Sequence, residues 1–325
     1  MRNVSVIGTG AIGSSWAALF LANGLEVQAY DPAHGAEERL RAFVEEAWKS
    51  LMELGLRPGA DRSKLQFHDS IGAAVAHASF IQESGPEQES AKIAIFREID
   101  QAAPSSTVIA TSSSHLSMSA IQRVCGHPGR CVHGHPFNPP HLIPLVEVLG
   151  GDLTDPEAVD RAMEFYKSIG KSPIRVLKAQ HGNVGNRLQR ALWQEAARMV
   201  AEGYVSAEDV ETALCKGPGL RWAIFGHFSI LNLGGGDEGF LGWMRKVSGL
   251  KIGDGIGSVT LTQELLDELL HGIAAHARGR SIAELSRERD EKLVSILKLV
   301  QTDANANANW SKAEPQGNDN KGINQ

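Results

Sequence analysis

A short β-branched run followed at once by a glycine-rich turn opens the chain, and it restricts the fold more than any other feature. Residues Asn3–Ile7 are typical of a buried strand, the turn Gly8–Gly13 has the sequence GTGAIG, and a helical pattern follows it. In such a turn the first glycine allows the bend, the second lets backbone approach a pyrophosphate, and the third lets the helix pack on the strand. The residues expected to contact a dinucleotide are Gly8, Gly10, Ala11, Ile12 and Gly13. The alternative is a glycine turn that merely joins a strand to a helix.

An acidic residue at the end of the second predicted strand narrows the choice of dinucleotide. Residues 26–31 form this strand, and Asp31 lies at the distance from the glycines that is expected for a carboxylate binding a ribose 2′-hydroxyl. No basic residue follows Asp31 until Arg39, so a 2′-phosphate has no partner there. The sequence therefore favours NAD over NADP.

Predicted strands and helices alternate as far as residue 177, which indicates βαβ units and a parallel sheet. A capping box at Thr154–Glu157 predicts the start of the last helix of this part. From Gly185 on the periodicity is helical almost throughout. We expect an N-terminal Rossmann-type, doubly wound α/β sheet followed by an all-helical C-terminal domain. The expected domains are residues 1–184 for NAD binding, 185–300 for substrate binding and dimerisation, and 301–325 as a disordered, polar tail.

Composition excludes several classes of function. The chain has 325 residues, 42% of them apolar, with a net charge of −6 and a pI near 6.1. An acidic chain has no electrostatic surface for nucleic acid, and no apolar run is long enough to cross a membrane. The N-terminus shows no signal peptide, and three cysteines form no disulfide framework. We expect a cytoplasmic protein.

Two apolar runs carry a histidine and a carboxylate that could work together. His135 ends one run, and Glu147 lies inside another, Leu145–Leu149. A charge in such a run is costly to bury without a partner, and an imidazole supported by a carboxylate is a proton shuttle. The alternative is a core histidine satisfied by a buried acid. The residues 125–135 also contain five potential metal ligands, but their spacing matches no recognised site, so we expect no metal.

Three motifs together resemble the L-3-hydroxyacyl-CoA dehydrogenase superfamily. They are GTGAIG at the N-terminus, GHPFNPP followed by PLVEV, and GNRLQRALWQEA at the predicted domain junction. More narrowly, these motifs look like the L-carnitine dehydrogenase and lambda-crystallin (L-gulonate 3-dehydrogenase) branch, which acts on free hydroxy acids. Within that branch, the segments that look most like carnitine dehydrogenase are IQESGPE, GHPFNP, GLRW and RSIAELSRERD. The likeness covers residues 1 to about 300.

The resemblance implies roles for individual residues. The proton-transferring histidine falls on His135 and its supporting glutamate on Glu147, while Ser114 and Asn186 match the residues that orient the alcohol. Two further positions that face the nicotinamide and its ribose in the family are Glu87 and Lys92. This chain reads SSSH at residues 112–115, where relatives commonly have other serine and threonine patterns, and no role follows for His115.

The same resemblance implies an NAD-dependent dehydrogenase of a small L-3-hydroxy acid that forms a homodimer. L-carnitine is the first choice, because the segments quoted above look most like carnitine dehydrogenase. Most of the aromatic residues that gather in the second domain are expected to pack in its core; the alternative is that some of them hold the quaternary ammonium, which an aromatic face attracts. Candidate substrate residues are Arg221, Trp222 and Phe225, although the arginine could equally form a structural ion pair. L-Gulonate is the second choice. A 3-hydroxyacyl-CoA is the third, because the predicted helix 37–54 carries five acids against three basic residues, a poor surface for a polyphosphate. From a different class, the chain could be a non-catalytic, crystallin-like NAD-binding protein.

Overall fold

The computed structural model describes residues 3–178, 183–256 and 259–301, so the expected tail lies outside the described residues from 302 on. The chain divides into two compact units, with the division between Trp193 and Gln194. The domain limits expected from the sequence stay a prediction. None of the described helices has the length and apolar character needed to cross a membrane.

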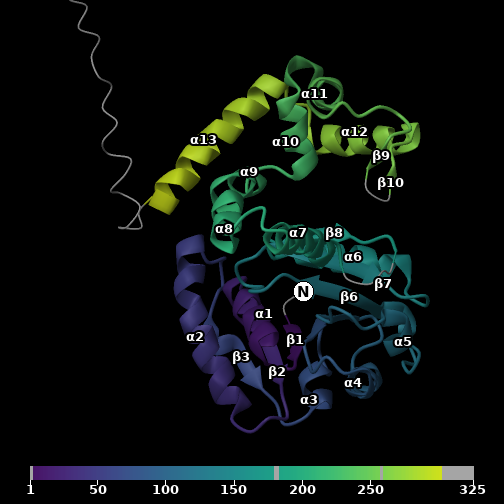
Figure 1. The fold of residues 1–325 in the computed structure, drawn as a ribbon. Helices are drawn as coiled ribbons and strands as arrows, with labels where there is room; N and C mark the ends of the chain where they lie inside the picture. Colours follow the sequence, from purple (N-terminus) through teal and green to yellow (C-terminus); the bar gives the residue numbers. More distant parts are fainter. Residues whose placement is uncertain (1–2, 179–182, 257–258, 302–325) are drawn as a thin grey trace, which may run out of the picture. The chain divides into compact units, whose positions relative to one another are not determined.

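An eight-stranded sheet forms the centre of the first unit (Figure 1). Its strands are β1 Asn3–Ile7, β2 Glu26–Tyr30, β3 Leu65–Phe67, β4 Phe80–Glu83, β5 Val108–Thr111, β6 Cys131–Pro136, β7 Leu145–Gly150 and β8 Ser172–Arg175. The order across the sheet is β3-β2-β1-β4-β5-β6-β7-β8, and every neighbouring pair is parallel except β6 and β7. Successive strands are added on one side of β1 as far as β3, and then on its other side from β4 onward, which is the order of a doubly wound fold. The predicted α/β fold class is confirmed.

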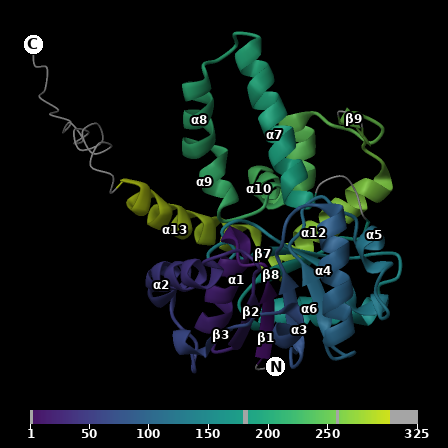
Figure 2. The same ribbon diagram turned by 90° about the horizontal axis from the view of Figure 1, so that it is seen from below.

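Helices cover both faces of this sheet. They are α1 Ala11–Ala22, α2 Ala36–Leu54, α3 Ile71–Val75, α4 Glu89–Ala102, α5 Met118–Gln122 and α6 Pro156–Ser168. One apolar core joins the sheet to α1, α2 and α6, and a second joins it to α3, α4 and α5. Figures 1 and 2 show α1 and α2 on the opposite side of the strands from α3 and α4. Sequence explains the difference between α1 and α2: α1 is apolar almost all round and buried, whereas α2 is amphipathic with one wet face.

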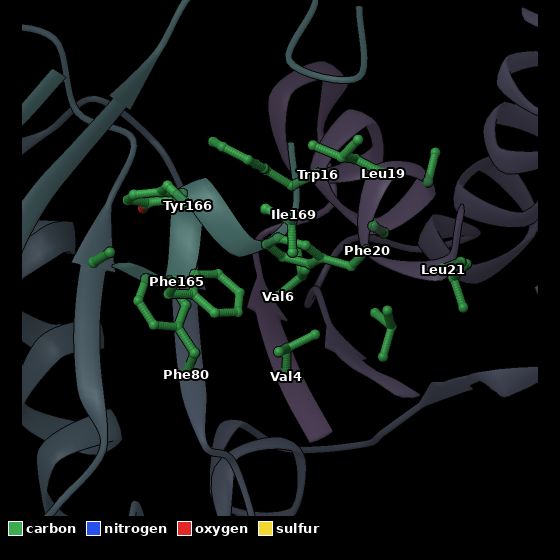
Figure 3. Close-up of a cluster of buried hydrophobic side chains, with 14 of the residues drawn as sticks. Val4, Val6, Trp16, Leu19, Phe20, Leu21, Phe80, Phe165, Tyr166 and Ile169 are labelled. Atoms are coloured by element: carbon green, nitrogen blue, oxygen red, sulfur yellow. The ribbon is translucent and has the colours of Figure 1, made fainter. Parts of the chain in front are cut away.

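Aromatic side chains fill the larger core (Figure 3). The rings of Phe80 on β4 and Phe165 on α6 stack with centroids 3.8 Å apart, and Trp16 and Phe20 stack along α1 at 5.4 Å. Tyr166 joins the two pairs, with its ring 5.6 Å from that of Trp16. Because each buried ring of this size contributes about 1.5–3 kcal/mol, this cluster fixes α1 and α6 against the strands that carry the site.

The antiparallel pair β6–β7 determines the geometry of the site. The two strands are joined by a short connection, so they pair as neighbours, and their register places His135 directly opposite Glu147. Side chains at paired positions of an antiparallel ladder point to the same face of the sheet. The two predicted catalytic residues therefore meet through backbone pairing.

The structure confirms a helix at Pro156–Ser168, but the predicted capping box at its start was wrong. The N-cap of α6 is Asp155, with no side-chain cap hydrogen bond, so Thr154–Glu157 forms no capping box. The Thr154 hydroxyl instead donates to the Cys131 carbonyl at 2.7 Å and accepts the Gly151 amide at 2.8 Å. A tertiary partner competes here with the helix end for the same hydroxyl.

Helices make up nearly all of the remaining described chain. They are α7 Val184–Ala201, α8 Ala207–Lys216, α9 Pro218–Trp222, α10 His227–Gly234, α11 Gly239–Trp243, α12 Gln263–Ala277 and α13 Ile282–Gln301. Ser206 caps α8 by accepting the Asp209 amide at 3.0 Å. A two-stranded ribbon, β9 Gly255–Ile256 with β10 Val259–Thr260, interrupts the helical pattern. The helical C-terminal region is confirmed, with this ribbon as an addition that the sequence pattern did not indicate.

Candidate active site

A buried histidine–glutamate pair forms the centre of the site. His135 Nδ1 lies 2.8 Å from Glu147 Oε2, and the two side chains are 7% and 1% exposed. The second carboxylate oxygen, Oε1, accepts the Gly185 amide at 2.9 Å. An ionised carboxylate can only accept hydrogen bonds, so Nδ1 carries the proton of the neutral ring and Nε2 keeps its lone pair. This is the tautomer of a histidine that can take a proton at Nε2.

Ser114 meets the free nitrogen of this histidine. Its hydroxyl oxygen lies 3.0 Å from His135 Nε2, and Ser114 belongs to the polar run that follows β5. In the parallel sheet β5 neighbours β6, so the residues after β5 lie beside the last residues of β6. Sheet topology thus brings together two residues that are twenty-one positions apart in the chain.

A cavity of about 310 Å³ opens in front of His135 and Ser114. Its other lining residues are Ile12, Ser112, Pro136, Phe137, Asn138, Asn186 and Gln189. Three of the four predicted catalytic residues therefore line one cavity, and the fourth, Glu147, lies behind His135. Ile12 belongs to the glycine turn and also to the first turn of α1, so the dinucleotide turn contributes to the same wall.

Sequence reasoning missed a polar network beneath this cavity. The Ser112 hydroxyl oxygen accepts the Gln82 amide at 2.9 Å and the Trp16 indole N–H at 3.3 Å, and it lies 2.8 Å from the Ser84 hydroxyl. The Tyr166 hydroxyl donates to Gln82 Oε1 at 2.6 Å, and burial raises its pKa. Buried polar groups of this kind are satisfied by one another, and they hold the ends of β4 and β5 together. The available signal in the sequence was a glutamine, Gln82, directly after two apolar strand residues.

The glycine turn has the features of a dinucleotide cradle. A Cβ atom added to Gly13 would lie 1.9 Å from the Gly8 carbonyl oxygen, and Gly8 itself has a φ of +87°. Gly10 has open space at its Cβ position and is the N-cap of α1, with no side-chain cap on the helix amides. The buried Thr9 hydroxyl has no hydrogen-bond partner in the described structure. Free amides, an unpartnered hydroxyl and room at Gly10 fit a bound pyrophosphate.

Asp31 lies at the end of β2 beside this turn. Its Oδ2 accepts the Thr9 amide at 2.7 Å and its Oδ1 accepts the Ala33 amide at 2.9 Å. Each carboxylate oxygen can accept a further bond, so a ribose hydroxyl can be bound by the same group. Asp31 thereby connects the second strand to the glycine turn. The residues of this half of the site fit NAD.

The structure places the other two predicted cofactor residues differently from each other. Glu87 is exposed, and its carboxylate contacts the loop that carries Ser114. Lys92 is 1% exposed, and its ammonium donates to both oxygens of Glu83, at 2.8 and 2.9 Å. The buried pair of Lys92 and Glu83 lies below the ends of β4 and β5. Contacts of Glu87 and Lys92 with the cofactor stay a prediction.

The predicted substrate residues of the C-terminal region belong to the second unit. Phe225 is 3% exposed and packs in a small core with Ile230, Leu233 and Leu285. Trp222 is 39% exposed, and Arg221 is exposed at the end of α9. A substrate contact for any of the three stays a prediction. His115, to which the family resemblance assigned no role, is exposed, and its amide donates to Glu87 Oε1 at 3.1 Å.

The stretch that offered five possible metal ligands shows a different arrangement. Cys125 and Cys131 are buried with their sulfur atoms 3.9 Å apart, and Arg130 pairs with Asp100 at 2.8 Å. Among residues 3–178, 183–256 and 259–301, no group of three or more histidine, cysteine or acidic side chains gathers around a possible metal position.

Two family models match consecutive parts of the chain, from residue 3 to residue 253. The NAD-binding domain of 3-hydroxyacyl-CoA dehydrogenase matches residues 3–180, and the C-terminal domain of the same family matches residues 182–253. The chain belongs to the 3-hydroxyacyl-CoA dehydrogenase family. It is therefore an NAD-dependent oxidoreductase that acts on CH–OH groups. The predicted family, fold and cofactor are confirmed.

Within the family, this chain is similar to enzymes named L-carnitine dehydrogenase. The chain is 44% identical over 304 residues to the L-carnitine dehydrogenase of Nocardiopsis dassonvillei, covering 93% of this chain and 92% of that one. It is 42% identical to the L-carnitine dehydrogenase of Oceanobacillus iheyensis, covering 93% and 99%. The predicted likeness to the carnitine dehydrogenase branch is thus confirmed.

Solved structures share the fold of the enzyme. A 5-formyl-3-hydroxy-2-methylpyridine 4-carboxylic acid 5-dehydrogenase, described as an NAD⁺-dependent dismutase, is 30% identical, with a TM-score of 0.69 over 93% of this chain and 98% of that one. The 3-hydroxybutyryl-CoA dehydrogenase of Escherichia coli is 25% identical, with a TM-score of 0.62 over 83% of this chain and 57% of that one.

Proposed function

We propose that this enzyme oxidises the 3-hydroxyl group of L-carnitine to give 3-dehydrocarnitine, with His135 and Glu147 as a proton shuttle. The observation that carries the chemistry is the line of contacts from Glu147 through His135 to Ser114 at the wall of one cavity. The substrate is inferred from the relatives, which are named L-carnitine dehydrogenase at 42–44% identity over most of the chain.

In this mechanism His135 acts as the general base. Its Nε2 takes the proton from the substrate hydroxyl, and the Glu147 carboxylate stabilises the imidazolium that forms. When bound, NAD supplies the hydride acceptor. Ser114 and Asn186 line the same cavity as neutral hydrogen-bonding groups, and they suit an oxygen that changes from alcohol to carbonyl. In the reverse direction the imidazolium returns the proton.

Two further observations favour a small free acid over a CoA thioester. Two of the three basic residues on α2 pair with acids, Arg41 with Glu37 at 2.7 Å and Lys49 with Glu46 at 2.6 Å, and the third, Arg39, donates to the His34 carbonyl at 2.8 Å. This helix therefore offers little positive charge to a polyphosphate. The cavity also includes the ring of Phe137, 6.1 Å from the ring of His135, and an aromatic face attracts a quaternary ammonium.

The test is NADH formation by the purified protein with excess NAD. L-carnitine, D-carnitine, L-gulonate, L-3-hydroxybutyrate and a short 3-hydroxyacyl-CoA are compared at equal concentrations. The proposal expects the highest kcat/KM for L-carnitine, and at least tenfold less for each other compound. A higher value for L-gulonate or the CoA ester would refute the substrate and leave the dehydrogenase. No turnover with any of them, together with tight NAD binding, would favour a crystallin-like NAD-binding protein.

We also propose that the enzyme is a homodimer in which α7 is covered by a second copy of the chain. No residue of α7 is buried within the described monomer, and its exposed apolar side chains include Leu188 and Trp193, each 68% exposed. A row of large apolar side chains on one helix marks an interaction surface, and twofold self-association is the commonest way to bury it. Sedimentation analysis of the wild type and of Leu188→Glu tests this. A monomeric wild type would refute it.

A further inference from the structure

Glu87 holds the loop that carries Ser114. One carboxylate oxygen, Oε1, accepts three hydrogen bonds: from the Ser113 hydroxyl at 2.6 Å, from the Ser114 amide at 3.1 Å and from the His115 amide at 3.1 Å. Although the residue as a whole is exposed, partial desolvation of its carboxylate works to raise the pKa of Glu87, but these hydrogen bonds and the nearby Lys92 charge outweigh it and the pKa is lowered. The carboxylate is therefore ionised at neutral pH, as a single oxygen with three donors requires.

The loop between residues 112 and 116 has further supports besides Glu87. The Ser113 amide donates to the Thr111 hydroxyl oxygen at 3.1 Å, and the Leu116 amide donates to the Ser113 hydroxyl oxygen at 3.2 Å. Ser113 itself is 1% exposed, so its hydroxyl has a fixed environment. Ser114 is different, because its side chain points to His135 Nε2 while its amide is bound only through Glu87 among the contacts described.

A buried ion pair fixes the segment from which Glu87 extends. The Lys92 ammonium donates to the Gly85 carbonyl at 2.9 Å as well as to both oxygens of Glu83. Glu83 in turn accepts the Thr111 hydroxyl at 2.6 Å, and its carboxylate also accepts the Gly85 amide at 2.6 Å. The ends of β4 and β5 are therefore tied together through Glu83 and Thr111, and the chain is held again at Gly85, two residues before Glu87. Glu87 thus starts from a rigid position, and its carboxylate can set the position of a neighbouring loop.

We propose that Glu87 is a positioning residue that sets the distance between the Ser114 hydroxyl and His135. The inference rests on the proposed proton shuttle, and it adds a role to the cofactor contact expected from the sequence. Without the carboxylate, the amides of Ser114 and His115 lose their acceptor and the loop is free to move. A shift of about 1 Å in a group that orients a substrate lowers the rate by up to about 100-fold. We therefore expect Glu87→Ala to lower kcat by about 10–100-fold.

The first test needs no substrate, so it stands even if the proposed function fails. Amide hydrogen exchange is measured for the peptide covering residues 112–117 in the wild type, Glu87→Ala and Glu87→Gln. Glu89→Ala is the matched control, because Glu89 is an exposed acid two residues further along. We expect exchange at least about tenfold faster in Glu87→Ala, an intermediate rate in Glu87→Gln, which keeps an acceptor oxygen, and no change in the control. Unchanged exchange in Glu87→Ala would overturn the inference.

The second test is a double-mutant cycle with the preferred hydroxy acid. Glu87→Ala, Ser114→Ala and the double variant are compared for kcat, for KM of the hydroxy acid and for the Kd of NAD. If Glu87 acts through Ser114, the double variant is no slower than Ser114→Ala, and the Kd of NAD stays within about twofold of wild type. Losses that multiply, or a raised Kd of NAD with kcat unchanged, would overturn the positioning role. The latter result would assign Glu87 to the cofactor instead.

Discussion

The exchange of Glu147 for glutamine gives the sharpest test of the shuttle, because it removes one charge and changes little else. In the wild type both carboxylate oxygens accept an N–H: Oε1 from the Gly185 amide at 2.9 Å and Oε2 from His135 at 2.8 Å. Gly185 can only donate, so the amide oxygen of glutamine will face it and the NH₂ group will face His135. The ring must then accept at Nδ1 and carry its proton on Nε2. In that tautomer it cannot take the hydroxyl proton.

The size of the loss follows from the charge that is removed. A carboxylate and an imidazolium with centres about 4 Å apart interact by about 4 kcal/mol at an effective dielectric constant of about 20. Since about 1.4 kcal/mol corresponds to a tenfold change in rate, full loss of this stabilisation is about 1,000-fold. We expect kcat of Glu147→Gln to fall by about 100–1,000-fold, with the Kd of NAD unchanged.

The assay compares kcat, the Kd of NAD and the free energy of unfolding in Glu147→Gln and in a control, Glu157→Gln. Glu157 lies exposed in the first turn of α6, so the same chemical change there should alter none of the three. If kcat decreases by less than about threefold, the proton shuttle is refuted. So would a parallel loss of NAD binding, because it would show that the variant disturbs the fold and not the proton transfer.

Three further predictions concern the cofactor half and the pH dependence of stability. Gly13→Ala places a Cβ 1.9 Å from the Gly8 carbonyl oxygen, so we expect the unfolding free energy to fall by about 1–3 kcal/mol and NAD binding to be lost. Gly10→Ala has open space at its Cβ and should weaken NAD binding without changing the unfolding free energy. Equal unfolding curves for the two variants would contradict this. Asp31→Asn should raise the KM for NAD by about tenfold with little change in kcat, and an unchanged KM in a titration with NAD would exclude the ribose contact. Burial lowers the pKa of His133 to about 4 from the ordinary value of 6.5, so the unfolded chain takes up the proton first as the pH falls. The unfolding free energy should therefore decrease by about 3 kcal/mol between pH 6.5 and pH 4. Denaturant titrations over this pH range should show that His133→Asn lacks this pH dependence.

Local sequence patterns predicted the parts of the site that depend on local structure. The glycine turn, Asp31 and the strand before them follow from backbone requirements that only a few residue types meet, and the structure has them in the expected elements. His135 and Glu147 could be suggested as a pair because a charge inside an apolar strand needs a partner. Their register in the β6–β7 pair was not predictable, since an apolar run shows neither the direction of its partner nor the alignment.

Contacts between segments that are distant in the chain could not be predicted from the sequence. Thr154 has the spacing of a capping box, but its hydroxyl bonds the Cys131 carbonyl, twenty-three residues away. The pairing of Lys92 with Glu83 depends on how α4 packs below the end of β4, and a lysine near the start of an amphipathic helix is usually solvated. The hydrogen bonds from residues 113–115 to Glu87 likewise join segments that follow two different strands, so only the folded sheet shows them.

The measurement that tests the central claim most directly is turnover of L-carnitine by His135→Ala beside the wild type, with NAD binding measured on both. The account predicts that the wild type forms NADH from L-carnitine, and that the variant loses at least about 100-fold in kcat while its Kd for NAD stays within about twofold. If the variant still oxidises L-carnitine at a rate close to that of the wild type, His135 is not the base, because some other group must then take the hydroxyl proton.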